Sequence, residues 1–292
     1  AVGAPAAPAP PDERLLHAVA NRRLLYSQLL TGQVFALPLA LATVALQFLD
    51  RPVWTFVGVA SFLTGMAGVL LRPARRIVDD WNFMVSTSST GTARTGRAHP
   101  SQQFVLRHGW LATRSQTAPL HRIQAISVVW PLLWRAARWA QVRVDVAGYG
   151  VHDRQAESHV DRLLPVAAPE VVRRVVGELL DGLDVTRLPL VRPPARARLV
   201  APLRWRYLGI WLGDTVLAAR DGWLTREVTV VPYARIQSVR VVQGPLRRAL
   251  RLAQVHVDTA GSMRMVLRDR GVAQAYPLAG EIAARARIAR AS

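Results

Sequence analysis

The stretches "PLHRIQAISVV" (119–129) and "PYARIQSVRVV" (232–242) are two versions of one sequence, and they lie 113 positions apart. The similarity continues on both sides without a gap, from 107–149 over 220–262, and nearly half of the aligned positions are identical. Unrelated segments would match far less often. A long period with two copies indicates a duplicated domain rather than a solenoid, so the sequence predicts one fold built twice.

Each copy has the pattern of a mainly β domain that ends in a helix. In the second copy, "GWLTREVTVVP" (222–232) and "RIQSVRVVQ" (235–243) alternate apolar and polar residues, as half-buried strands do. We expect a short helical turn over 245–253, a hairpin of "MRMVLRD" with "VAQAYPL", and a short strand leading into a helix within both 163–180 and 275–290. The predicted fold class is α+β, mainly β: a sandwich or open barrel closed by a C-terminal amphipathic helix.

The charge of the chain is strongly positive and unevenly distributed. There are 38 basic residues, all of them Arg, against 19 acidic ones, and no Cys. Without Cys the chain has no disulfides, thiolate metal ligands or cysteine nucleophiles. Residues 185–292 carry nineteen Arg against six acidic residues. Whatever partner needs positive charge is therefore expected to bind mainly the last third of the chain.

Two adjacent stretches, 24–49 and 53–71, contain no charged residue. Each is long enough to cross about 30 Å of hydrocarbon as a helix, and we interpret 24–72 as a transmembrane hairpin. The alternative is a buried helical hairpin in a soluble core. Because Arg residues flank both outer ends, the positive-inside rule places both termini in the cytoplasm and two spans in the inner membrane. Residues 1–23 are expected to form a disordered or short cytoplasmic leader.

The sequence "WL…VP…RIQSV…QGPLRR…L…A.V.VDTAG", preceded by a two-helix hairpin, resembles the YdbS/YdbT-like bacterial pleckstrin-homology (PH) family. The resemblance implies a seven-stranded β-sandwich capped by a C-terminal helix, present twice and tethered to the bacterial inner membrane. We assign 81–184 and 204–292 to the two PH-like domains and 185–203 to a basic, Pro-rich linker. Residues 185–212 are interrupted by Arg and cannot form a second hairpin, and 86–103 are interpreted as a flexible polar loop.

Polar residues that recur in both copies are the first candidates for a site. They are Arg122, Gln124 and Asp145 in the first copy, and Arg235, Gln237 and Asp258 in the second. One hypothesis is a ligand or lipid-headgroup site. A structural role is favoured, because both copies need the fold and need not share a ligand. For the two Asp residues we expect a pair with an Arg or hydrogen bonds to backbone amides in a turn.

A second candidate is a basic surface around the second domain, interleaved with Trp and Tyr. We predict that it docks on anionic lipids of the inner leaflet, where each basic residue contributes about 1 kcal/mol; its residues are Arg192, Arg196, Arg198, Arg204, Arg206, Arg247, Arg248 and Arg251. The alternative is an ordinary solvated surface. Nucleic acid is disfavoured as the partner, because the sequence has no recognition helix and no RNP-type aromatic strand.

No catalytic motif of the G-x-S-x-G, H-E-x-x-H or P-loop type occurs in the sequence. We therefore predict no catalytic residue, metal site or cofactor. One cluster of His and carboxylates lies in a polar turn that the second copy lacks, and exposed turn residues are its favoured interpretation over a weak metal site: His152, Asp153, His159 and Asp161.

The function expected from these features is that of a non-enzymatic, membrane-anchored scaffold on the cytoplasmic face. The resemblance suggests a role in envelope stress handling. The partner is an unidentified protein, such as a sister PH-like membrane protein or a second copy of this chain. The alternative is a module that binds anionic lipid or a small ligand at the inner leaflet.

Overall fold

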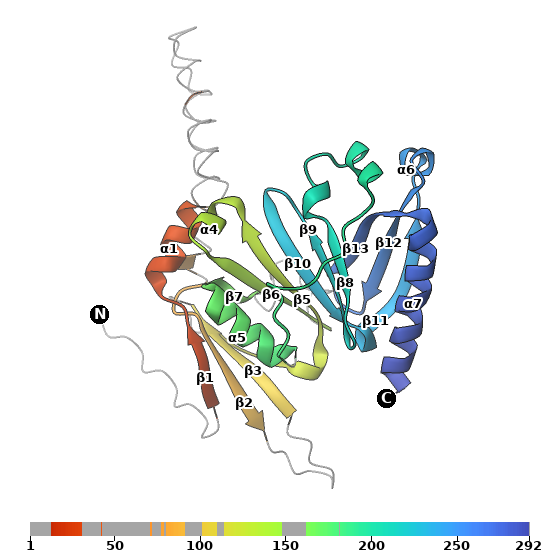
Figure 1. Cartoon of the computed structure of the whole chain (residues 1–292). Helices are drawn as coiled ribbons and strands as arrows, with labels where there is room; N and C mark the ends of the chain where they lie inside the picture. Colours follow the sequence, from red (N-terminus) through yellow and green to blue (C-terminus); the bar gives the residue numbers. More distant parts are fainter. Residues whose placement is uncertain are drawn as a thin grey trace, which may run out of the picture.

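The computed structural model describes residues 13–30, 42, 71, 77–78, 80–90, 101–109, 114–147, 162–180 and 182–291. Two small sandwiches lie side by side, and a helix packs against each of them (Figure 1). Within these residues no helix is long and apolar enough to cross a membrane. Most of the predicted hairpin, 24–72, lies outside the described residues and stays a prediction.

The first copy contains seven strands among the described residues. Its first sheet has the spatial order β1 (Glu13–Ala18), β2 (Met84–Thr90), β3 (Ser101–His108) and β4 (Arg114–Pro119). The chain then continues through η1 (Leu120–Arg122), β5 (Ile123–Pro131), α4 (Leu132–Ala136), β6 (Ala140–Val146) and β7 (Arg162–Ala167). Helix α5 (Pro169–Leu179) closes the sandwich, because Val172, Val175 and Val176 form one buried face at helical spacing.

The second copy repeats this plan with six strands. The 3-10 turns η3 (Ala195–Leu199) and η4 (Trp205–Tyr207) precede β8 (Gly209–Leu212), β9 (Val216–Asp221) and β10 (Thr225–Pro232). After these come η5 (Tyr233–Arg235), β11 (Ile236–Val242), α6 (Pro245–Ala249), β12 (Leu252–Thr259), β13 (Arg264–Gly271) and α7 (Val272–Ala291). In place of a seventh strand, Val191 makes a single antiparallel bridge to Ile210 of β8.

The duplication predicted from the sequence is confirmed, because equivalent elements keep the spacing of 113 residues. Helices α4 and α6 begin and end at equivalent positions. Two residues past the end of each of these helices, one residue adopts a positive φ. These two residues, Arg138 (55°) and Arg251 (50°), are also at equivalent positions. Gly109 and Gly222, again equivalent, both have a positive φ, which glycine adopts without strain.

The two copies are joined by direct strand pairing. β5 of the first copy pairs antiparallel with β10 of the second, with Val128 opposite Val228 and Ile126 opposite Val230. This pairing merges two three-stranded sheets into one six-stranded sheet of order β7-β6-β5-β10-β9-β8. β11, β12 and β13 form a separate three-stranded sheet. The two copies therefore form a single folded body rather than two independent domains joined by a linker.

A separate core lies on each face of the shared sheet, because successive side chains of a strand point to opposite faces. On one face, Val228 and Val230 of the second copy join the core of the first, together with Ile126 and Val128. On the other face, Ala125 of the first copy joins the core of the second. Each copy thus completes the core of the other.

The N-terminal segment differs from the expected leader. From Glu13 on it is not disordered: β1 pairs with β2, and α1 (Asn21–Leu29) follows. The first copy therefore starts before the uncharged stretches, which lie between its first and second strands in the sequence. Leu24 is fully buried in the core of the first copy, and Trp134 Nε1 donates a hydrogen bond to the Ser27 carbonyl. The first predicted span therefore cannot begin at residue 24, because its first turn packs on the domain.

Three further expectations need correction. The flexible loop predicted over 86–103 overlaps two strands, because β2 extends to Thr90 and β3 starts at Ser101; buried Ser86 donates to the Val105 carbonyl. Residues 272–278 belong to α7, not to a strand of a hairpin, because β13 already supplies the last strand. The linker predicted over 185–203 packs on the body, where Val185 and Ala197 are buried.

Candidate functional site

Asp145, one of the repeated polar residues, joins the two copies. Its side chain is only 2% exposed and accepts hydrogen bonds from the backbone amides of Ser262 (2.9 Å) and Met263 (2.8 Å) and from the Ser262 hydroxyl (3.1 Å). These donors belong to the turn between β12 and β13 of the second copy. A Cβ on Gly261 would lie 1.9 Å from the Asp145 carboxylate, so the turn can approach only with glycine there.

Asp258, the equivalent residue of the second copy, lies on the surface and bonds within its own sheet. Its carboxylate accepts hydrogen bonds from the Ser238 hydroxyl (2.7 Å) and from Arg240 (3.0 and 3.2 Å). The hydrogen bond from Ser238 lowers the pKa of Asp258, and Arg240 lowers it further. The two partner types expected for these Asp residues both occur: backbone amides for Asp145 and an Arg for Asp258.

The other repeated residues are not brought together into one site. Gln124 is buried and donates to the Arg122 carbonyl at 3.1 Å, whereas its equivalent, Gln237, is exposed. Arg122 and Arg235 end the 3-10 turns η1 and η5 of their separate copies. For Gln124 the contact is local and structural, in line with the interpretation favoured from the sequence.

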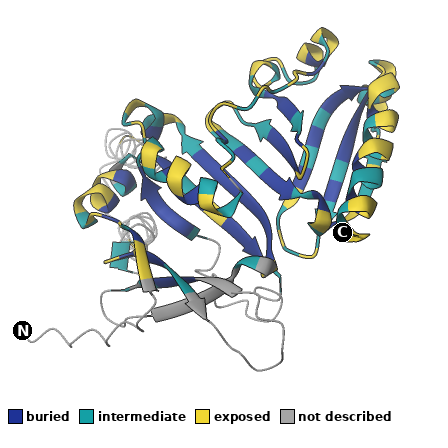
Figure 2. Ribbon diagram, turned by 60° about the horizontal axis from the view of Figure 1, so that its bottom comes forward, coloured by how far each residue is buried: buried dark blue, intermediate teal, exposed yellow. Residues whose placement is uncertain are grey.

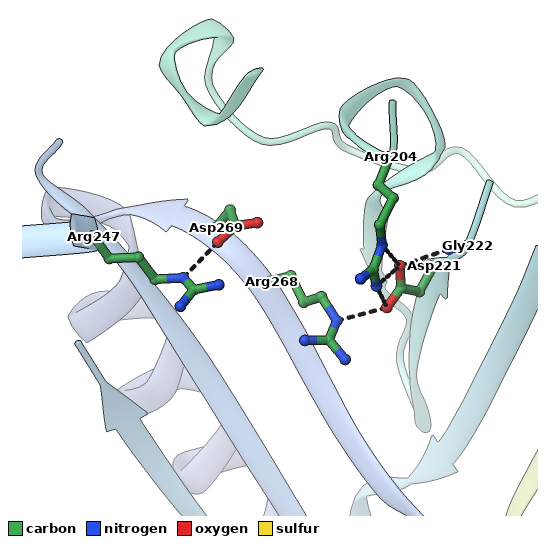
Figure 3. A network of polar contacts seen from close by, with 6 residues as sticks. All are labelled: Arg204, Asp221, Gly222, Arg247, Arg268 and Asp269. Atoms are coloured by element: carbon green, nitrogen blue, oxygen red, sulfur yellow. Dashed lines mark hydrogen bonds and ion pairs between the residues drawn. The ribbon is translucent and has the colours of Figure 1, made fainter. Parts of the chain in front are cut away.

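The predicted basic surface divides into residues that are held in contacts and residues that are free to meet a partner. Arg204 forms a bidentate pair with Asp221, and Arg268 binds the same carboxylate at 2.6 Å (Figure 3). Burial raises the pKa of Asp221, but the hydrogen bonds from the two Arg outweigh it and hold that pKa below 3.8. This carboxylate therefore connects the segment before β8 to the end of β9 and to the middle of β13.

Two more of the predicted residues have structural contacts. Arg247 of α6 binds Asp269 at 2.7 Å (Figure 3), and Asp269 has a positive φ of 54°. Arg198 stacks on Trp205, 4.0 Å from the ring centroid. The remaining members of the set are exposed, and none of them forms an ion pair with another described residue: Arg192, Arg196, Arg206, Arg248 and Arg251.

Large apolar side chains are exposed next to these Arg residues, a feature that the sequence analysis missed. Leu199 is 71% exposed, Leu203 58% and Leu246 60%. They lie in or beside η3, η4 and α6, and most residues of η3 and α6 are coloured as exposed in Figure 2. Single Leu residues among Arg and Pro show no periodicity, so composition alone did not reveal them.

Within the described part of the chain, no group of three His, Asp or Glu side chains could hold a metal ion. The His152, Asp153, His159 and Asp161 cluster lies outside the described residues.

A duplicated sandwich of this kind, with a helix closing each copy, is the fold expected of a PH-like protein. The chain matches the family model "Bacterial PH domain" over residues 34–180 and again over 185–286. These two ranges span most of the chain, one match to a copy, and the chain belongs to the bacterial PH domain family. The family suggests a module that binds proteins or lipids. No curated protein and no solved structure matches the chain.

Proposed function

We propose that this protein is a non-enzymatic scaffold of the YdbS/YdbT-like type, anchored in the bacterial inner membrane by residues 31–71 with its PH copies in the cytoplasm. The observation that carries the proposal is the joining of the two copies through β5 and β10 into one body. Binding surfaces held in one fixed geometry lose little freedom when partners bind. A rigid tandem at a membrane suits the assembly of partners, and a role in envelope stress is part of this proposal.

The surface offered to a protein partner is the β11 edge. In the first copy the equivalent strand, β5, already binds a protein strand, β10. β11 ends its sheet, and no described strand pairs with its other side. An extended segment of a partner, from a sister PH protein or a second copy of this chain, can add there through backbone hydrogen bonds.

The anchoring half of the proposal is tested by cysteine labelling, which is clean because the chain has no Cys. Arg51→Cys lies in the connector between the two uncharged stretches, and Ile288→Cys near the end of α7. A membrane-impermeant maleimide added to intact cells should label position 51, and position 288 only after permeabilisation. Equal labelling of both positions in intact cells would contradict the anchor.

The scaffold half is tested with a photo-crosslinking amino acid at Val242 on β11, with Ile288 as the control. Both positions are exposed, at 43% and 71%. Crosslinking in native membranes should give a product of defined mass from position 242 and none from position 288. The same products from both positions, or none from either, would remove the β11 edge as the binding surface.

Contact with an anionic lipid surface is the second candidate function. The observation that favours it is the group of five exposed Arg residues around η3, η4 and α6.

A further inference from the structure

We propose that one end of the second copy is a lipid contact surface that lies on the anionic inner leaflet. We define this surface, the rim, as residues 191–208, the β9–β10 turn (222–224) and α6. The inference deepens the lipid candidate above and rests on the proposed anchoring. It adds which side of the molecule faces the bilayer and which apolar side chains enter it.

The duplication places the rim in the position of the predicted membrane spans. In the first copy, the chain between β1 and β2 contains α1 and the uncharged stretches. In the second copy, the Val191–Ile210 bridge replaces the β1–β2 pairing, and the chain between these residues contains η3 and η4. Residues 192–208 are therefore the counterpart of the segment that the first copy uses to reach the membrane.

A series of contacts shows that the rim lies at the same end of the molecule as α1. Trp134 of α4 binds the carbonyl of Ser27 in α1 at 3.0 Å. Its neighbour Arg135 donates to the carbonyls of Trp223 (3.0 Å) and Leu224 (3.2 Å) in the β9–β10 turn. Asp221, just before that turn, binds Arg204 of the rim. These elements, together with α6, line the upper end of the body in Figure 1.

The side chains of the rim suit the boundary between headgroups and acyl chains. Leu199, Leu203 and Leu246 project apolar surface into solvent, and burial of such surface gains about 25 cal/mol per Å². An exposed Arg lies within two residues of each of them along the chain, and each such Arg contributes about 1 kcal/mol near an anionic leaflet. Leu beside Arg and Trp is the composition of segments that lie in the interface plane. Scattered Leu residues alone would be ordinary; here they coincide with charge and with the position of the spans.

The rim is also held in shape before any lipid binds. Asp221 forms a salt bridge with Arg204, and Asp269 forms one with Arg247 of α6 (Figure 3). Trp205 donates its indole N–H to the Pro194 carbonyl at 2.9 Å and stacks under Arg198. Docking therefore requires little ordering of the backbone, so most of the gain from Leu insertion and Arg attraction is retained.

The test uses the full chain reconstituted in vesicles, with one cysteine per variant carrying an environment-sensitive dye. Leu199→Cys and Leu203→Cys report on the rim. Ile288→Cys and Leu15→Cys are controls matched in exposure, at 71% against 71% and 58% against 58%. In phosphatidylglycerol-rich vesicles the rim dyes should shift to the blue and be quenched by bilayer-embedded nitroxide lipids, while the control dyes stay as in water. In pure phosphatidylcholine the rim signal should weaken.

The outcomes separate this inference from the proposed anchoring. If the protein floats with vesicles but the rim dyes behave like the controls, the rim inference is wrong and the anchor stands. If the protein does not float with vesicles, the anchor itself is wrong. An equal rim signal in neutral and anionic vesicles would remove the role of Arg and thereby overturn the proposal of an anionic surface.

Discussion

β5 and β11 are nearly the same strand in two different environments. "IQAISVV" of β5 is buried throughout, whereas most of "IQSVRVV" of β11 is partly or fully exposed. On the face toward the other copy, β5 presents Ala125, Ser127 and Val129, of which Ala125 packs into the other core. β11 has Ser238, Arg240 and Val242 at these positions. On this face, the strand that joins the copies and the strand that stays on the surface thus differ at two positions: Ala125 is replaced by Ser238, and Ser127 by the larger, charged Arg240.

The same divergence is seen in the repeated Asp. Asp145 bonds the turn of the other copy, whereas Asp258 holds Arg240 on the surface of β11. Identical residues therefore carry different roles, and the neighbour in space decides which.

The largest difference in stability is expected between two variants that place an Asp at equivalent positions of β5 and β11. Val129→Asp buries a carboxylate at a site only 5% exposed, without a partner, and should cost about 3–5 kcal/mol of stability or prevent folding. Val242→Asp, at 43% exposure, should stay within about 0.5 kcal/mol. Denaturant unfolding of the full chain measures both. Similar losses of stability in the two variants would mean that β5 is not covered by the second copy. If Val129→Asp does not fold, Val129→Ala replaces it in the comparison.

Removal of the carboxylate charge at the repeated Asp residues, Asp145 and Asp258, should have the next largest effect on stability. Asp145→Asn gives up charged hydrogen bonds to buried amides and should cost about 1.5–3 kcal/mol. Asp258→Asn loses a surface pair worth at most about 1 kcal/mol. Thermal unfolding at low and high salt checks the difference, because salt screens the exposed pair more strongly than the buried bonds. If Asp145→Asn lost no more stability than Asp258→Asn, and its loss depended on salt to the same extent, the buried contact of Asp145 would be contradicted.

Alanine at two glycines should change stability in opposite directions. Gly261→Ala forces a methyl group against the Asp145 carboxylate and should destabilise the chain by about 1–3 kcal/mol. Gly280, inside α7, has open space around it, and Gly280→Ala should stabilise by about 0.5–1 kcal/mol. Melting temperatures of the two variants provide the measurement. A neutral Gly261→Ala would show that the turn does not approach Asp145.

The smallest expected effect on stability is a difference in acid sensitivity at Asp221, which holds Arg204 of the rim. Since the pKa of Asp221 is lowered on folding, its ionised form adds stability above the unfolded value of 3.8, and this is lost as pH falls through the folded pKa. Asp221→Asn should be less stable than the wild type near neutral pH, and the gap should close in acid. Unfolding midpoints along a pH series test this. A gap that stays constant with pH would mean that Asp221 is not ionised in its pair.

Much of the fold could be predicted because the repeat is strong and its strands alternate. The strand over 225–232 and the turn at 245–249 lie where the pattern indicated. The β5–β10 pairing could not be predicted, because alternation shows that a strand has an apolar face and not which strand lies beside it. The role of β1 was missed for a related reason: "ERLLHA" is short and pairs only with β2, which begins at Met84.

For the candidate site, the residue types were easier to predict than their contacts. The sequence singled out Asp145 and offered its two partner types, but the donors lie 117 and 118 residues away. Arg204 and Arg247 were predicted as lipid ligands, and both are instead occupied by Asp221 and Asp269. A count of charges cannot separate paired from free Arg, since pairing depends on where acidic residues fold.

Native-state hydrogen exchange of the full chain tests the central claim, that strand pairing makes the two copies one body. We predict that amides along β5 and β10 exchange only through global unfolding, together and at the slowest rate, while alternate amides of β11 exchange much faster because no described strand bonds them. If instead the two copies showed separate unfolding free energies, and β5 exchanged as fast as β11, the account of a fused tandem would be wrong.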